Sequence, residues 1–353
     1  MRNGTLTLAI VVKVADALSV KAMTVIAESR EGDPVKFGPF SIGQIEAGLN
    51  HFLASVPPEE RESVFEAIVR GGTRAVVTLE EVIKLLIDRN GRGIPIKPKV
   101  TANVCDPNRS FYLEAFNLVD PTGLITMMVS YQKLFSQSPL FGLVDEYTRR
   151  FDAIRAKVAA NPCIANLFVG PSYPVILPQI PEGDYGKAVL EDFILPVVKA
   201  SYEAAFPGRK FINRREGQLK FNNRREGQFK SQVTIVDERH QQLVTDLTKN
   251  PIVGILMFPL QGFSVHAQRQ FAKLMPEGIS LAGPIEIGVG EALYPKHLSR
   301  DNNTPVKDCS AVQWRGSGLS LCFDASDGKL EFDFGYGLGG AYAVSSGALF
   351  VRG

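Results

Sequence analysis

The residues best suited to chemistry in this chain are paired arginines, which occur in two adjacent copies of one decapeptide. FINRREGQLK (211–220, the first copy) is followed directly by FNNRREGQFK (221–230, the second copy), and eight of the ten positions are identical. Guanidinium groups present planar pairs of donors that match carboxylate and phosphate oxygens. The repeat therefore predicts an anion-binding surface made of the basic residues of both copies: Arg214, Arg215, Lys220, Arg224, Arg225 and Lys230.

The positive charge of the chain is concentrated around this repeat. Residues 209–230 contain eight basic and two acidic residues, a net charge of +6, whereas the whole chain carries +2 and the remainder therefore −4. A mildly acidic body with one basic segment indicates a local anion-binding surface rather than a generally basic nucleic-acid coat. We expect a non-enzymatic binding or assembly protein whose partner is nucleic acid or an acidic protein surface, including that of a neighbouring subunit in a homo-oligomer.

Two simpler interpretations of the repeat stay open. Glu216 and Glu226 each follow an arginine pair and are able to neutralise it. The second copy also fits a neutral duplication, because an insertion into an exposed loop costs little closure entropy.

Two motifs resemble enzyme sites but lack the required context. Residues 335–340 fit GxGxxG, yet only 13 residues follow, too few for the crossover helix and second strand of a dinucleotide-binding unit. Ser264 lies in a sequence like a nucleophile elbow, but His266 replaces the closing glycine, so we expect Ser264 to be a helix N-cap.

Histidine and cysteine are too sparse and too dispersed to indicate a metal or a cofactor. The four histidines show no metal-ligand spacing, and the four cysteines include no CxxC pair. We therefore predict no cofactor, no metal and no assigned catalytic residue, and we expect His240 to be a surface or capping residue. The alternative function is a hydrolase-like enzyme that uses His240 or His266 with a nearby carboxylate in the C-terminal half.

Composition places the chain among ordinary globular proteins. Of its 353 residues, 45% are hydrophobic and 22% charged. Few cysteines favour a reducing compartment, which predicts a cytoplasmic protein. The long uncharged stretches at 158–181 and 334–351 are interrupted by prolines and glycines respectively, so neither predicts a membrane-spanning helix.

The two halves of the chain differ in periodicity. Residues 1–161 predict a mainly helical domain, because apolar residues recur at spacings of three and four in the segments 41–56, 59–70, 78–91, 109–118, 123–135 and 141–160.

Residues 162–353 predict an α+β domain. Helices are expected at 184–206, 237–248 and 264–274, and strands at 251–258 and 279–288. The basic segment predicts a three-stranded β-meander (209–236), in which each RREG is a four-residue connection. Five residues are expected on its buried face: Leu219, Phe221, Phe229, Val233 and Ile235. A C-terminal sheet segment (318–351) is expected to begin with a hairpin that turns at residues 326–328. The predicted fold is α+β, with a mostly helical N-terminal part and a C-terminal antiparallel or mixed sheet flanked by helices.

Overall fold

The computed structural model of the chain describes residues 36–37, 40–41, 99–114, 121–137, 144–159, 170–223, 228–315, 318–326 and 328–352. The chain divides into two compact units, residues 1–96 and 97–353. In the first unit, β1 (Lys36–Phe37) and β2 (Phe40–Ser41) form an antiparallel pair. The helices predicted at 41–56, 59–70 and 78–91 lie outside the described residues.

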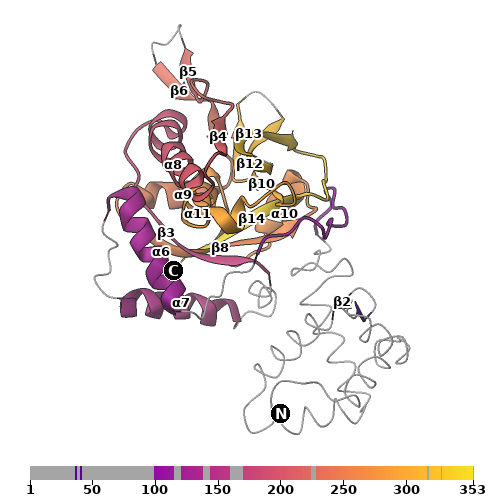
Figure 1. The fold of residues 1–353 in the computed structure, drawn as a ribbon. Helices are drawn as coiled ribbons and strands as arrows, with labels where there is room; N and C mark the ends of the chain where they lie inside the picture. Colours follow the sequence, from indigo (N-terminus) through magenta and orange to yellow (C-terminus); the bar gives the residue numbers. More distant parts are fainter. Residues whose placement is uncertain are drawn as a thin grey trace. The chain divides into compact units, whose positions relative to one another are not determined.

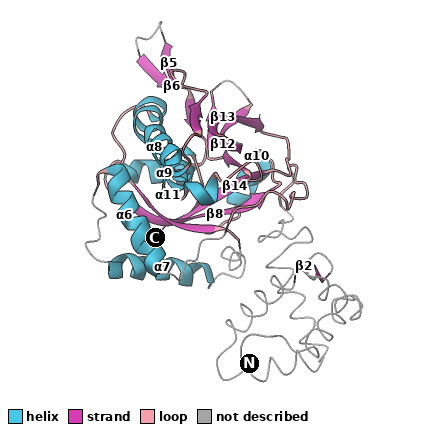
Figure 2. Cartoon of the chain, viewed as in Figure 1, coloured by secondary structure: helices cyan, strands magenta, loops and turns pink. Residues whose placement is uncertain are grey.

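An eight-stranded mixed sheet forms the centre of the second unit (Figures 1 and 2). Its order is β3-β8-β14-β10-β12-β13-β4, and β9 pairs with β14 beside this path. Neighbouring strands are antiparallel except in the pairs β10–β14 and β13–β4, which are parallel. The strands are β3 (Ser172–Leu177), β4 (Lys210–Asn213), β8 (Ile252–Gln261), β9 (Ile279–Leu281), β10 (Val306–Cys309), β12 (Leu319–Ser326), β13 (Lys329–Gly337) and β14 (Ser345–Arg352).

Helices flank this sheet, which confirms the predicted α+β class for the C-terminal part. The helices that the sequence predicts from residue 123 onward are all present. They are α6 (Pro121–Phe135), α7 (Val144–Ala159), the π-helix η2 (Tyr185–Ile194) continued by α8 (Leu195–Ala205), α9 (Glu238–Leu247) and α10 (Val265–Ala272). Two further helices, α11 (Pro284–Leu293) and α12 (Pro295–Leu298), follow β9.

Side-chain caps define the start of three of these helices. Asp184, Asp237 and Ser264 each accept a hydrogen bond from a backbone N–H three residues later, which satisfies one of the free donors of the first turn. The predicted N-cap role of Ser264 is confirmed.

The central strands of the sheet are buried on both faces. Along β14, Ala348 and Phe350 belong to the large hydrophobic cluster that includes residues of η2, α8 and α11. The alternate residues Leu349 and Val351 are also buried, on the opposite side of the strand, and α10 packs against β14 and β9. Burial on both faces explains why residues 348–351 of β14 are continuously apolar rather than alternating.

Two elements differ from the sequence prediction. The strand predicted at 279–288 ends as β9 at Leu281, and α11 begins at Pro284, because proline suits the first turn of a helix and Glu286 Oε2 accepts from Gly283 N at 3.0 Å. In the helix predicted at 109–118, the described residues 109–114 are not helical.

The second unit also begins earlier than the domain boundary predicted near residue 161. It starts at Lys97 and includes α6, which packs against β3, α8 and α11. Met127, Tyr131 and Phe135 of α6 are buried in the same cluster as the sheet, so this helix shares the core of the C-terminal unit.

Candidate anion-binding site

The first copy of the decapeptide lies along the edge of the large sheet. Its strand β4 pairs in parallel with β13, with Lys210 opposite Lys329 and Asn213 opposite Phe332. The backbone N–H of Arg214 then donates to Phe332 O at 3.0 Å, and the chain turns at Gly217, whose φ of +71° suits glycine.

The predicted three-stranded meander is not formed. β4 pairs with β13, whereas β5 (Lys220–Asn223) and β6 (Gln228–Ser231) pair with each other in a separate two-stranded sheet. The strand β7 (Val233–Ile235) pairs with β11 (Val312–Trp314). Pairing with β13 brings the arginines of the first copy beside acidic side chains, a gain that local strand pairing would not provide.

Both arginines of the first copy bind carboxylates on β13. Arg214 contacts Glu331 through Nε at 2.6 Å and Nη2 at 2.5 Å, both to Oε1. Arg215 contacts Asp333 Oδ1 through Nε and Nη2, both at 2.7 Å. The guanidinium carbon of Arg215 also lies 4.0 Å from the centre of the Phe334 ring, a cation–π contact. These partners lie on β13 rather than at the neighbouring Glu216.

The spacing of the acidic residues explains why two adjacent arginines fit them. Glu331 and Asp333 are two positions apart on one strand, so their side chains point to the same face. Lys329 Nζ also lies 2.9 Å from Glu331 Oε2. Burial alone would raise the pKa of Glu331, but hydrogen bonds from Lys329 and Arg214 hold it below its ordinary value. The carboxylate is therefore charged at neutral pH.

The second copy forms a hairpin, as predicted for its RREG connection. β5 and β6 are antiparallel, with Lys220 opposite Ser231 and Asn223 opposite Gln228, so residues 224–227 form the link between the two strands. This link contains Arg224 and Arg225 and lies outside the described residues. In Figure 1 the hairpin stands away from the large sheet and its helices, beyond β4.

The base of the hairpin is fixed to the body of the unit. Gln232 N donates to Leu219 O at 3.1 Å, and Gly186 N donates to Ser231 Oγ at 3.2 Å. Of the five residues expected on the buried face, Leu219 and Val233 are buried and Ile235 is partly buried, whereas the side chains of Phe221 and Phe229 lie outside the described part. The structure describes the positions of four of the six predicted residues. Arg214 and Arg215 lie against β13, whereas Lys220 and Lys230 belong to the strands of the hairpin.

His240 is not a surface or capping residue, so that prediction is wrong. Its side chain is fully buried, with Nδ1 at 2.8 Å from Glu286 Oε1 and Nε2 at 3.1 Å from the Tyr185 hydroxyl. Burial, together with the charge of Glu286, raises the pKa of Tyr185 well above its ordinary value, so the phenol stays protonated. His240, Leu243 and Leu247 share the buried face of α9. Their spacing of three and four residues is that of a buried helix face, and it could have predicted the burial of His240.

Tyr185, His240 and Glu286 form a hydrogen-bonded triad, and a small pocket lies beside Tyr185. Its volume is about 260 Å³, and Tyr185 lines it together with Gln241, Thr248 and apolar residues of η2, β7 and α9. The second histidine of the enzyme alternative, His266, is exposed on α10.

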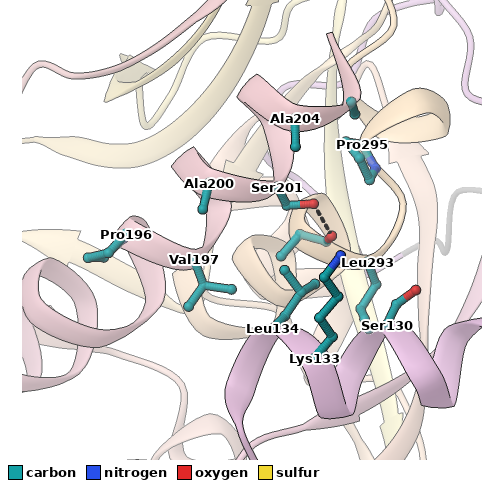
Figure 3. Close-up of a pocket in the computed structure, with 12 residues that line it drawn as sticks. Ser130, Lys133, Leu134, Pro196, Val197, Ala200, Ser201, Ala204, Leu293 and Pro295 are labelled. Atoms are coloured by element: carbon teal, nitrogen blue, oxygen red, sulfur yellow. Dashed lines mark hydrogen bonds between the residues drawn. The ribbon is translucent and has the colours of Figure 1, made fainter. Parts of the chain in front are cut away.

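The groove of Figure 3 is a larger hollow, of about 660 Å³, between α6, α8 and the end of α11. Small and apolar side chains of α8 line one wall, and Ser201 Oγ donates to Ala292 O at 2.6 Å across it. Lys133 of α6 is the charged residue among the described lining residues. The other polar side chains that line the groove are those of Ser130 and Ser201.

Within the described ranges, no group of three or more His, Cys, Asp or Glu side chains is arranged to hold a metal ion. No helix in the described part is long and apolar enough to cross a membrane. The chain matches no protein-family model, no curated protein and no solved structure.

Proposed function

We propose that this chain is a non-enzymatic binding or assembly protein and that its second copy binds an acidic surface of a partner protein. The observation that supports the proposal is the behaviour of the first copy, whose Arg214 and Arg215 bind Glu331 and Asp333 on β13. The second copy carries the same NRREGQ sequence, so its arginines present the same chemistry to a ligand.

The placement of the two copies supports a division of roles. The first copy is held against the sheet by its own ion pairs, whereas the second copy is linked to the body through the paired strands β5 and β6. The connection of this hairpin contains two arginines and each of its strands contains one lysine, so positive charge is concentrated in this segment of the sequence.

Carboxylates are favoured over nucleic acid as the ligand of this hairpin. In the first copy, each arginine binds one carboxylate, and the two carboxylates lie two residues apart on an extended strand. An acidic protein segment reproduces this spacing directly. The remainder of the chain has a net charge of −4, so a second copy of the protein offers such an acidic surface.

A fluorescence-anisotropy titration tests the proposal with two probes of equal charge, labelled poly-glutamate and labelled oligothymidylate. We expect the protein to bind poly-glutamate, and the substitutions Arg224→Ala and Arg225→Ala together to weaken this binding roughly tenfold, since each exposed pair contributes up to about 1 kcal/mol. The matched control is Lys199→Ala with Lys273→Ala, which removes two exposed charges elsewhere on the unit.

Two results would contradict the proposal. Equal loss of binding in the control pair would show a general charge effect. Tighter binding of oligothymidylate, lost in the Arg224 and Arg225 variant and with a strong dependence on salt, would identify nucleic acid as the partner. Analytical ultracentrifugation of the protein alone reports whether a second copy of the chain is bound.

The buried triad supports a second candidate, a hydrolase-like enzyme. The imidazole of His240 lies between a carboxylate and a phenol, and the phenol borders a pocket. If this triad moves a proton to a substrate, Tyr185→Phe must abolish hydrolysis of small ester or amide substrates while the protein stays folded. If the triad only joins η2, α9 and α11, no hydrolysis is measured and the substitution lowers stability.

A further inference from the structure

We propose that the two copies of the decapeptide exchange places within one molecule, so that the second copy can pair with β13 while the first copy forms the projecting hairpin. The exchange is a shift of the chain by ten residues along the edge of the sheet. It goes beyond the proposed function, because it concerns which copy is displayed and not what the displayed copy binds.

The second copy carries most of the groups that hold the first copy in place. Phe211 is buried, Asn213 Oδ1 accepts from Arg215 N at 2.9 Å, and Gly217 N donates to Glu191 Oε1 at 2.6 Å. The second copy has the same residue at each of these positions and at both arginines, and a lysine precedes each copy. The two differing positions replace Ile212 by asparagine and the buried Leu219 by phenylalanine, so the arrangement described above is the favoured one.

The geometry at the base of the hairpin permits the shift without moving the body of the unit. Lys220 lies opposite Ser231, and Gln232 N donates to Leu219 O at 3.1 Å. After a shift of ten residues, Lys230 occupies the present place of Lys220 and is bonded directly to Ser231. Phe229 then occupies the present place of Leu219, so its carbonyl oxygen accepts from the backbone N–H of Gln232. These residues are three positions apart, and a hydrogen bond with this spacing is that of a β-turn.

The N-terminal end of the repeat also permits the shift. In the exchanged state Lys220 occupies the present place of Lys210. Residues 210–219 then form a loop that leaves the sheet after residue 209 and returns to it at Lys220. They contain the first RREG, so they are able to form a hairpin of the kind that β5 and β6 form now. A tandem duplication at the edge of a sheet thus provides two registers with nearly the same set of contacts.

The first test compares one substitution in two backgrounds. Phe211→Asp places a charge in the buried site beside β13. In the full-length chain, the second copy can replace the damaged first copy, so we expect a small fall in Tm. In a chain that lacks residues 221–230 no replacement exists, and we expect a large fall or loss of folding. Equal losses of Tm in both backgrounds would overturn the proposal.

The second test traps the exchanged register with a disulfide. Lys210→Cys with Lys329→Cys is the control, because these residues are opposite each other in the described register. Lys220→Cys with Lys329→Cys forms a bond within one chain only after exchange. We expect this cross-link to form more slowly than the control, as mapped by mass spectrometry, and Phe221→Asp to abolish it.

Two results of the trapping experiment would overturn the proposal. One is formation of the control cross-link with no cross-link between positions 220 and 329. The other is a cross-link between those positions that joins two chains, because that would show exchange between molecules and not within one.

Discussion

At the scale of single residues, the chemistry of this protein is the pairing of guanidinium groups with carboxylates. Arg215 shows it most fully, because it combines two contacts to Asp333 with stacking on Phe334. The planar guanidinium serves both interactions, and a lysine ammonium would serve only the charge.

We therefore predict that Arg215→Ala lowers the free energy of unfolding by about 1 kcal/mol, with roughly equal shares from the ion pair and the ring contact. Arg215→Lys should lose about half as much, because it keeps the charge without the planar geometry. Urea denaturation of the two variants measures both values. Equal stability of wild type and Arg215→Ala would show that this contact contributes nothing.

A buried carboxylate on β10 predicts a dependence of stability on pH. Burial raises the pKa of Asp308 from its ordinary value of 3.8 to about 7, although Gln268 Nε2 donates to it at 3.0 Å. Between these two values the unfolded chain has lost this proton and the folded chain still holds it. The contribution of Asp308 is therefore fully present at low pH and is lost as pH rises to about 7.

The substitution Asp308→Asn tests this dependence. The amide oxygen still accepts from Gln268 and carries no charge, so we expect Tm to decline less between pH 4 and pH 7 than in wild type, and to be higher at pH 8. Thermal unfolding across this pH range measures the difference. Parallel curves for the two proteins would assign the pH dependence to other groups.

At the scale of elements, the hairpin depends on how closely its base approaches η2. A Cβ built on Gly186 would lie 2.3 Å from Leu219 O and 2.9 Å from Ser231 Oγ. Real side chains do not reach such distances, so a larger residue must displace the base of the hairpin.

We predict that Gly186→Ala destabilises the unit by about 1–3 kcal/mol, the usual range for overpacking. Gly318→Ala is the matched control, because a Cβ there meets no atom within 4 Å and its backbone does not require glycine. The control should be neutral or slightly stabilising. Chemical denaturation compares the two, and equal effects would show that Gly186 has room for a side chain.

The elements themselves divide into those that local sequence predicts and those that it does not. Helices α9 and α10 follow from an apolar stripe and a capping residue, and the β12–β13 hairpin follows from alternation on either side of Gly328, whose φ is +89°. The start of α11 does not follow from the sequence. The apolar alternation around Pro284 also fits a strand, which is why a strand was predicted there.

At the scale of the whole molecule, the sequence identified the repeat but not its partner strand. Arg214 and Glu331 are separated by 117 residues, so no local pattern indicates that β4 pairs with β13. The candidate site was therefore predicted as one surface of six basic residues, whereas two of them are bound by the chain itself. The pairing of His240 with Glu286, 46 residues apart, was missed for the same reason.

The central claim is that the second copy is a separable binding element on an otherwise complete unit. Deleting residues 221–230 joins Lys220 to Ser231, which are already opposite each other, and leaves Leu219 O and Gln232 N in position for a β-turn. The measurement is thermal unfolding and poly-glutamate binding of this variant beside wild type. We predict an unchanged Tm and loss of binding. A folded variant that still binds poly-glutamate as tightly as wild type would contradict the claim.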